Sequence, residues 1–544
     1  MAGSGGIETT FELLAQTENE AAVEILIPAL DSPDRSIQEG ALRSLLKRRS
    51  LAGQREILRR LHLVDERWKA IIEEYRASMS HAMRDAVLDP SPQLCANGCQ
   101  AILWFREYDL LPALVNALED EANPNAELAA ATLLDLMDLF YGELSGEGPW
   151  RQRRDPALLR QRIMNCLEES LHRFGRHRRA AIIEAFLMLS AYDNLALRRI
   201  LLDPLDSRYL PLVDVLTHSP RPGVQRLILD FLDDPHAPSS TLALIAHRSD
   251  LPFIERLLRH VGAEPTATVR HNLARVGGIA WLREPRALLD ALDETYQPAL
   301  VQLVQATSMN RLECFGVIAY LAVQGKVAGR RAAVAALRDF HGVEANKVAL
   351  KALEDDDDEV QARAVGQLRD RGIPGAISIL IDALASPSEL VRDAARECLS
   401  EFAFPRFLAT FDMLDEEVRG TTGLLVKKID PRAAPLLREE MKSPSRRRRI
   451  RALQMAVAIQ AENELLEEIL VAIGDSDHLV RLEAARALGQ CHSLEAFAAL
   501  REAEDDRSLT VREAAAASLD RIARRSPDLA LLSSARTPEE QLHE

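Results

Sequence analysis

A short apolar pattern recurs along the chain and constrains its fold more than any other feature. It consists of Val or Ile, then Ala four residues later, then Leu four residues after that. Offsets of four and eight place three side chains on one side of an α-helix, and the central Ala lets a second helix approach closely. The pattern therefore predicts helices that pack on neighbouring helices. It occurs at Ile37-Ala41-Leu45, Val360-Ala364-Leu368, Val391-Ala395-Leu399, Val480-Ala484-Leu488 and Val511-Ala515-Leu519.

The copies are regularly spaced. The second and third copies are 31 residues apart, as are the fourth and fifth, and the 89 residues between Val391 and Val480 are close to three such units. Two weaker copies are expected in that interval, one near Val418 and one in the helix after Ser443. A turn rich in Asp, Ser and Pro precedes each copy, and a second apolar helix precedes the turn. Neither helix can bury its apolar stripe alone, so the helix-turn-helix units must stack. Expected first helices include residues 110–118, 376–384 and 464–473.

Composition agrees with an all-α fold. Aromatic residues make up 5% of the 544 residues, and the abundant Ala, Leu, Arg and Glu favour helices over strands. The net charge is -16, so no overall basic field attracts nucleic acid or an anionic membrane. The first twenty residues contain no apolar run of signal-peptide length, and no later stretch approaches a membrane span. We therefore expect a cytoplasmic protein.

The cysteine pattern does not indicate disulfide bonds. Six cysteines are thinly scattered through the long chain, so reduced thiols are expected. Cys95 and Cys99 lie four residues apart on one helix face, but no second such pair exists to complete a metal site. We interpret them as small core thiols and predict no metal and no cofactor.

These repeats resemble a known family, the HEAT-like repeats, and particularly the short bacterial variety first associated with phycobilin lyase subunits. The second helix opens with Val-Arg-x-Ala-Ala at Val391 and Val511, whereas at Val480 the two Ala residues fall one place later. The turn before it is acidic or Ser-Pro. The first helix carries a proline at Pro28, Pro112, Pro211 and Pro435.

The resemblance implies an α-solenoid of stacked HEAT-like repeats whose second helices line a concave surface. It also implies that turn Asp and helix Arg side chains pair along the stack as a ladder. The match is strong over residues 320–525, weaker over 20–140 and degenerate over 155–320. The positions that carry the ladder role over to this chain are Arg392, Arg481, Arg512, Asp475 and Asp506.

The changes in pattern predict five segments. They are degenerate N-terminal repeats (1–141), an irregular loop (142–157), divergent helical repeats (158–320), a regular repeat array (321–525), and a C-terminal cap with a polar tail (526–544).

Two basic segments depart from the repeat and are candidate binding sites. The loop contains Trp150 beside three arginines, which could stack on a base and contact phosphate, or could simply be a solvated loop. At the start of a second helix, five cations occupy six positions where the family usually has an acidic turn. This cluster either docks an acidic peptide, a phosphate or a nucleic acid backbone, or pairs with nearby carboxylates such as those of Glu416, Glu417, Glu439 and Glu440. The candidate binding residues are Trp150, Arg151, Arg153, Arg154, Arg446, Arg447, Arg448, Arg449 and Arg451.

The sequence offers no catalytic constellation. It contains no P-loop, H-E-x-x-H, G-x-S-x-G or paired C-x-x-C motif. The di-iron hydroxylase that shares the repeat fold uses His-Glu pairs, but the one pair in this chain is His543-Glu544 at its end. Repeat-built DNA glycosylases use a basic channel with aromatic residues, whereas the four Trp here are widely spread.

We therefore expect a non-enzymatic scaffold that binds a protein or peptide partner on its concave surface, since stacked repeats expose a long surface that can vary without harming the core. One alternative is a nucleic-acid-binding solenoid that uses the basic segments. A second alternative is a bilin lyase-like subunit.

Overall fold

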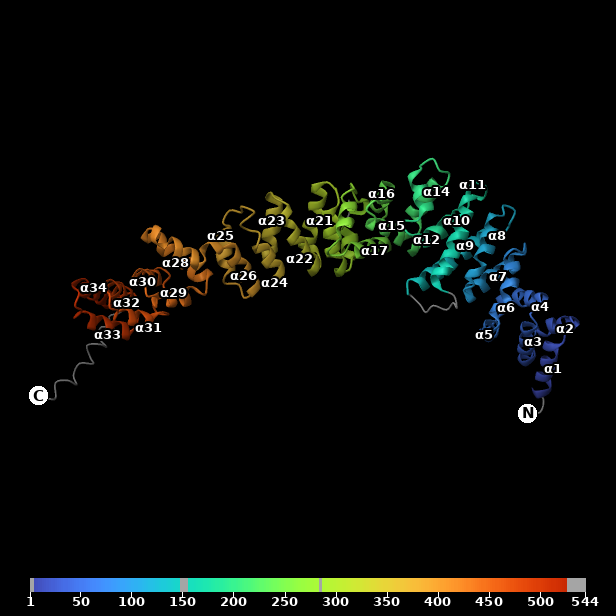
Figure 1. The fold of residues 1–544 in the computed structure, drawn as a ribbon, viewed down its shortest axis with the longest axis horizontal. Coiled ribbons are helices and arrows are strands. Elements are labelled where there is room, and N and C mark those ends of the chain that lie inside the picture. Colours follow the sequence, from blue (N-terminus) through green and yellow to red (C-terminus); the bar gives the residue numbers. More distant parts are fainter. Residues whose placement is uncertain (1–3, 147–154, 283–285, 526–544) are drawn as a thin grey trace. The chain divides into compact units, whose positions relative to one another are not determined.

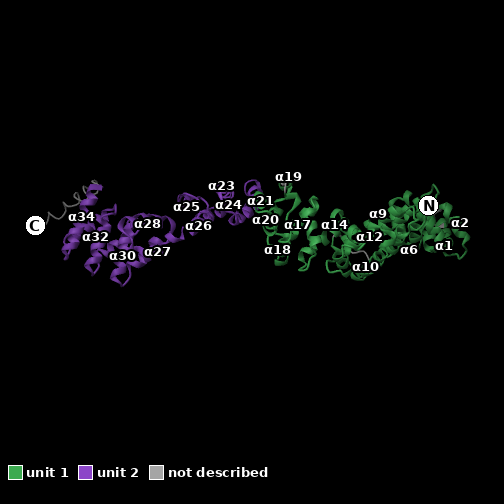
Figure 2. Cartoon of the chain, turned by 90° about the horizontal axis from the view of Figure 1, so that it is seen from above, with its two compact units in different colours: residues 1–317 green, residues 318–544 purple. Residues whose placement is uncertain are grey.

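The computed structural model describes residues 4–146, 155–282 and 286–525, and in these ranges the chain forms 34 α-helices, several short 3-10 helices and no strand. This confirms the all-α prediction. The chain divides into two compact units, residues 1–317 and 318–544, and the division falls within α21 (Arg311–Gln324) (Figures 1 and 2). The predicted division of the chain into five sequence segments stays a prediction.

Unit 1 is a succession of short helices. They are α1 (Ser4–Gln16), α2 (Ala21–Ala29), α3 (Arg35–Arg48), α4 (Leu51–Arg59), α5 (Glu66–Glu74), α6 (Arg76–Val87), α7 (Pro92–Phe105), α8 (Leu111–Glu119), α9 (Ala126–Leu144), α10 (Pro156–His172), α11 (Phe174–His177), α12 (Ala180–Leu189), α13 (Leu195–Leu202), α14 (Tyr209–His218), α15 (Pro222–Asp230), α16 (Ser239–His247), α17 (Leu251–Val261), α18 (Ala267–Leu273), α19 (Arg286–Ala291) and α20 (Gln297–Ala306).

Unit 2 alternates first and second helices along its length. They are α22 (Val327–Ala336), α23 (Val343–Lys351), α24 (Asp358–Val365), α25 (Ala376–Ala383), α26 (Glu389–Cys398), α27 (Phe404–Thr410), α28 (Glu416–Ile429), α29 (Ala433–Met441), α30 (Arg446–Ala458), α31 (Leu466–Ala472), α32 (His478–Leu488), α33 (Leu494–Ala503) and α34 (Leu509–Arg525).

The recurring Val-Ala-Leu pattern forms the packing stripe that its spacing predicts. Of the fifteen side chains in the five copies, thirteen are buried, and the other two, Ile37 and Leu519, are half-buried. The turn residues start the helices as expected. The carboxylates of Asp357 and Asp477 accept hydrogen bonds from the first free backbone N–H groups of α24 and α32.

Second helices pack directly on one another in each unit, with the first helices on their other side. In unit 1 this row contains α7, α9, α12 and α15, and in unit 2 it contains α22, α24 and α26, then α28, α30, α32 and α34. Small residues permit the contact: a Cβ at Gly423 in α28 would lie 2.3 Å from the carbonyl oxygen of Ala458 in α30. The row is interrupted between α26 and α28, where the core of unit 2 divides into two clusters.

One expectation needs correction. Val418 is in a helix, as predicted, but its side chain is exposed, because α28 buries Gly423, Val426 and Ile429 instead and so presents a shifted stripe. The described part of residues 158–320, where the sequence pattern is degenerate and divergent helical repeats are expected, contains packed helix pairs such as α14 with α15.

Candidate functional site

Arginine and aspartate side chains of successive turns contact one another in unit 2. Arg481 donates two hydrogen bonds to the carboxylate of Asp506, with N–O distances of 2.7 and 2.9 Å. Arg449 forms an ion pair with Asp475, with Nε 2.8 Å from Oδ2, and its Nη2 donates a hydrogen bond to Oδ1 at 3.2 Å. Each arginine also donates to two backbone carbonyl oxygens of the turn before its own helix. One guanidinium therefore joins two successive turns.

A further ladder pair lies at the start of unit 2. Arg330 donates to Asp355 at 2.8 and 3.0 Å. Arg392 and Arg512 occupy the equivalent place and donate to the carbonyl oxygens of their own turns, but no carboxylate within the described ranges pairs with either. These contacts have the expected electrostatic effect, since the hydrogen bond from Arg481 holds the pKa of Asp506 below its usual value and the same bond raises the pKa of Arg481.

The arginine cluster at the start of α30 separates into two groups. Arg449 is one of the predicted binding residues, but only 18% of its side chain is exposed. It is the fourth residue of α30, as Arg481 is the fourth residue of α32, and it takes the same place in the ladder. Arg446, Arg447 and Arg448 lie on the surface, and their side chains are between half and five-sixths exposed.

Every arginine of this cluster contacts a carboxylate. Arg448 binds Glu440 through two hydrogen bonds of 2.5 and 2.7 Å, which lowers the pKa of Glu440. Glu440 is one of the partners considered from sequence. The other contacts are made by aspartates of neighbouring turns: Arg446 with Asp477 at 3.3 Å, Arg447 with Asp412 at 2.9 Å, and Arg451 with Asp412 at 3.9 Å. Nearby carboxylates thus offset much of the local positive charge.

The second candidate site cannot be placed. Trp150, Arg151, Arg153 and Arg154 lie outside the described residues. Helix α9 runs to Leu144 and α10 begins at Pro156, so the described ends of the expected loop are helical.

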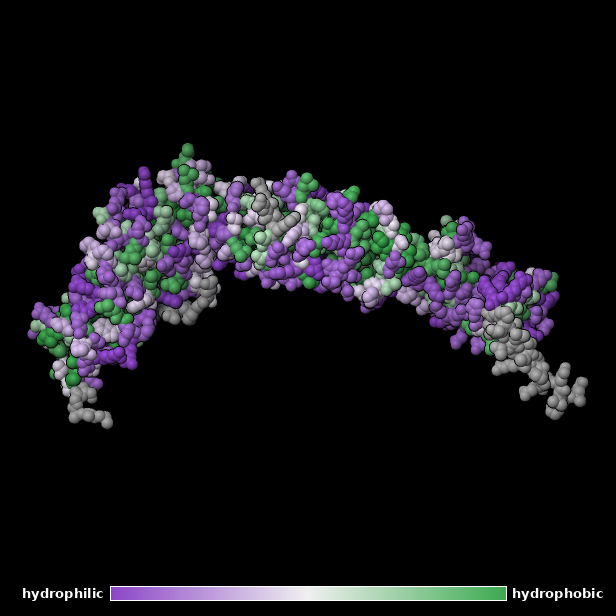
Figure 3. Space-filling model, turned by 180° about the vertical axis from the view of Figure 1, so that it is seen from behind, coloured by the Kyte–Doolittle hydropathy of each residue, from purple (hydrophilic) through white to green (hydrophobic). Residues whose placement is uncertain are grey.

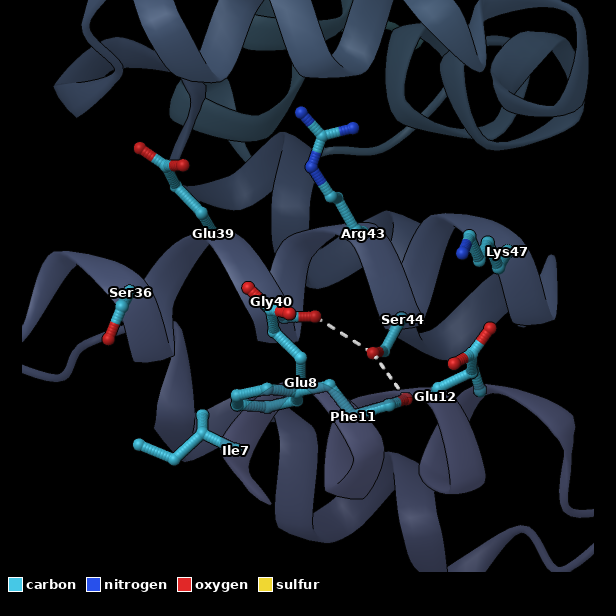
Figure 4. Close-up of a pocket in the computed structure, with 11 residues that line it drawn as sticks. Ile7, Glu8, Phe11, Glu12, Ser36, Glu39, Gly40, Arg43, Ser44 and Lys47 are labelled. Atoms are coloured by element: carbon cyan, nitrogen blue, oxygen red, sulfur yellow. Dashed lines mark hydrogen bonds between the residues drawn. The ribbon is translucent and has the colours of Figure 1, made fainter. Parts of the chain in front are cut away.

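A pocket of about 380 Å³ lies between α1 and α3. Figure 4 shows the Ser44 hydroxyl between the two helices, within hydrogen-bonding distance of the carbonyl oxygens of Phe11 (2.9 Å) and Gly40 (2.8 Å). The pocket is lined by charges of both signs, and Arg43 is already paired with Glu74 at 2.9 Å. This mixture selects no class of ligand.

The cysteines behave as core side chains. Cys95, Cys99, Cys314 and Cys491 are buried, and Cys166 and Cys398 are half-buried. Among the described residues, no three His, Cys, Asp or Glu side chains converge as a metal site. No helix in these ranges is long and apolar enough to cross a membrane.

Comparison with protein families identifies the repeat. The family described as HEAT repeats matches residues 317–400, 434–520 and 463–539. Residues 317–400 and 434–539 are therefore HEAT repeats. The gap in the match, residues 401–433, coincides with the interruption between α26 and α28, so the irregular stretch of the HEAT array is visible in both sequence and packing.

Comparisons with individual proteins add little. No curated protein matches the sequence. UNC-45 from Drosophila melanogaster is 10% identical, with 98% of this chain and 92% of that chain covered and a TM-score of 0.26. Kap121p is 14% identical, with 96% and 57% covered and a TM-score of 0.25. Human deoxyhypusine hydroxylase is 23% identical, with 39% and 96% covered and a TM-score of 0.16. TM-scores this low carry no argument about the chain.

Proposed function

We propose that this HEAT-repeat chain is a non-enzymatic scaffold that binds a protein or peptide partner along the surface formed by its second helices. The observation that carries the proposal is that different positions on those helices face the core and the solvent. Their apolar stripes are buried in the core, while the opposite positions hold exposed side chains of both charges, including Asp393, Glu397, Arg486 and Glu513. Such a surface can be adapted to a partner without a change in the core.

Exposed leucines favour a protein as the partner. Four leucines on α13, on α14 and between them have between 73 and 94% of their surface exposed: Leu195, Leu202, Leu205 and Leu210. Hydrophobic residues also reach the surface elsewhere on both units (Figure 3). Exposed apolar side chains suit contact with a protein, and they contribute nothing to contacts with phosphate.

The test is affinity capture from a lysate of the source organism, with and without nuclease. Two variants are compared with the wild type. The first removes the surface arginines as R446A/R447A/R448A and keeps the ladder residue Arg449. The control removes three other exposed arginines of unit 2, as R406A/R501A/R507A, and so has the same net charge.

We expect capture of a protein partner that is still recovered after nuclease treatment. The wild type and both variants should all bind it. Recovery of nucleic acid alone, lost in R446A/R447A/R448A and kept in the control, would instead show that the chain is a nucleic-acid-binding solenoid.

A further inference from the structure

A pocket lies between the second helices α7 and α9. It has a volume of about 430 Å³ and opens to solvent. We call it the α7–α9 pocket. Helix α7 contributes Leu103 at its end and Arg106 just after it, and α9 contributes Asp135, Asp138, Leu139 and Glu143.

The spacing on α9 explains why these side chains line one wall. Asp135, Asp138 and Leu139 are separated by three and four residues, so they lie on the same side of the helix. The opposite side of α9 carries Leu136 and Phe140, which are fully buried. The pocket therefore belongs to the face that the proposed function assigns to partners.

Arg106 and Glu143 form the inner end of the pocket. Arg106 has a left-handed backbone conformation (φ 52°) at the end of α7, and its guanidinium pairs with one carboxylate oxygen of Glu143. Only 1% of the Glu143 side chain is exposed. Its second oxygen, Oε2, is buried and has no hydrogen-bond partner within the described part of the chain.

The outer carboxylates share one arginine. Arg221, at the start of α15, donates to Asp135 at 3.1 Å and also contacts Asp138 through a single carboxylate oxygen. The other oxygen of Asp138, Oδ1, is buried and likewise lacks a partner in the described ranges. Desolvation raises the pKa of Asp138 in spite of the contact with Arg221.

The balance of charge and acceptors points to a cation. Among the described residues, the carboxylates of Asp135, Asp138 and Glu143 contact the guanidinium groups of Arg106 and Arg221, and in these ranges two of their oxygens are buried without a hydrogen-bond donor. A buried acceptor without a donor is unfavourable, and a charged one more so. The apolar walls, Leu103 and Leu139, suit the alkyl stem of a long side chain whose charged end reaches the carboxylates.

We propose that the α7–α9 pocket binds a basic side chain of the partner, arginine in preference to lysine. The planar guanidinium has donors in a fixed fork that can reach carboxylates on two residues at once, whereas an ammonium group is a compact point charge. This proposal rests on the proposed function, because it supplies the chemistry by which a protein partner is held on the second helices.

The test uses the full chain and two small probes. Binding of N-acetyl-arginine amide is measured by ligand-observed saturation-transfer NMR against N-acetyl-citrulline amide, its neutral isostere. The variant D135N/D138N removes two of the carboxylates. The variant L139K keeps them but places an internal cation in the pocket. The control E127Q removes one negative charge from the exposed first turn of the same helix.

We expect arginine amide to give at least a fivefold stronger signal than citrulline amide with the wild type and E127Q. The two signals should become equal in D135N/D138N and L139K, each with the melting temperature of the wild type. Equal signals in the wild type, or an unchanged preference in both pocket variants, would overturn the proposal.

The two proposals fail separately. If no protein partner is captured from lysate while arginine amide still binds in the pocket, the scaffold function is wrong and the pocket assignment stands. If a partner is captured equally well by wild type and D135N/D138N, and arginine amide does not bind, the pocket assignment is wrong and the scaffold function stands.

Discussion

Replacement of Arg481 by methionine should locally open the end of unit 2, and the buried thiol of Cys491 should report that opening. Methionine keeps the apolar stem of the side chain but removes the guanidinium that joins two turns. Cys491 lies three residues beyond α32, the helix that carries Arg481, and only 1% of its surface is exposed. Burial raises the pKa of this thiol to about 12, so it reacts with an alkylating reagent only when the local structure opens.

The contacts of Arg481 set the expected magnitude. Two hydrogen bonds join it to the carboxylate of Asp506, and two more join it to the carbonyl oxygens of Asp475 and Ser476. The side chains of Arg481 and Asp506 are only 9 and 14% exposed, so solvent replaces little of what is lost. A hydrogen bond to a charged group contributes about 1.5–3 kcal/mol, so the variant should lose at least ~2 kcal/mol of local stability. Since 1.4 kcal/mol is a factor of ten, labelling of Cys491 should accelerate about 30-fold or more.

The assay is timed alkylation of the native protein followed by mass spectrometry of the peptide that contains Cys491. The matched control is R486M, which removes an arginine from the same helix. Arg486 is 59% exposed and pairs with Glu483 three residues away on the same helix, and an exposed pair of this kind contributes about 0.3–0.5 kcal/mol. R486M should therefore accelerate labelling about twofold. Similar rates for the two variants would refute the claim that the ladder stabilises the array.

Three other results are expected. G423A should destabilise the protein by about 1–3 kcal/mol, measured by denaturant unfolding, because its new methyl group would meet the backbone of Ala458 rather than a movable side chain. L205D should reduce capture of a protein partner and leave the melting temperature unchanged, since this side chain is 94% exposed. The hydrogen bond from Arg481 lowers the pKa of Asp506 from its ordinary value of 3.8. The contribution of this pair to the stability of the folded state should therefore be complete above pH 3.8 and should be lost as the pH falls through the lower folded-state pKa. The melting temperatures of R481M and wild type should accordingly converge in acid.

The repeat could be predicted from sequence because its physics is local and periodic. Because residues four apart lie on the same face of an α-helix, the spacing of Val480, Ala484 and Leu488 predicts a buried stripe. All three side chains are fully buried. The Asp or Ser at each turn is recognisable for the same reason, since a helix start requires an acceptor for its free N–H groups. The shifted stripe of α28 escaped detection because its buried positions include Gly423, which carries no apolar side chain to count.

The α7–α9 pocket had no comparable signal. Arg221 reaches Asp135 across 86 residues of sequence, and the contact depends on the stacking of α9, α12 and α15. A periodic pattern reveals the buried side of each helix. It contains no information on which exposed side chains of separate repeats come together.

The arginine run of α30 shows how register decides between a structural and a functional reading. Taken as composition, the run from Arg446 to Arg449 is one basic patch. Aligned with α32, it contains one ladder residue at Arg449 followed by the stripe, and the three arginines before it occupy the exposed turn end of the helix. A variant that replaces all four arginines would remove a ladder contact and at the same time reduce the positive charge of the surface. A loss of binding could then not be assigned to either effect. Only substitutions that spare Arg449 separate recognition from stability.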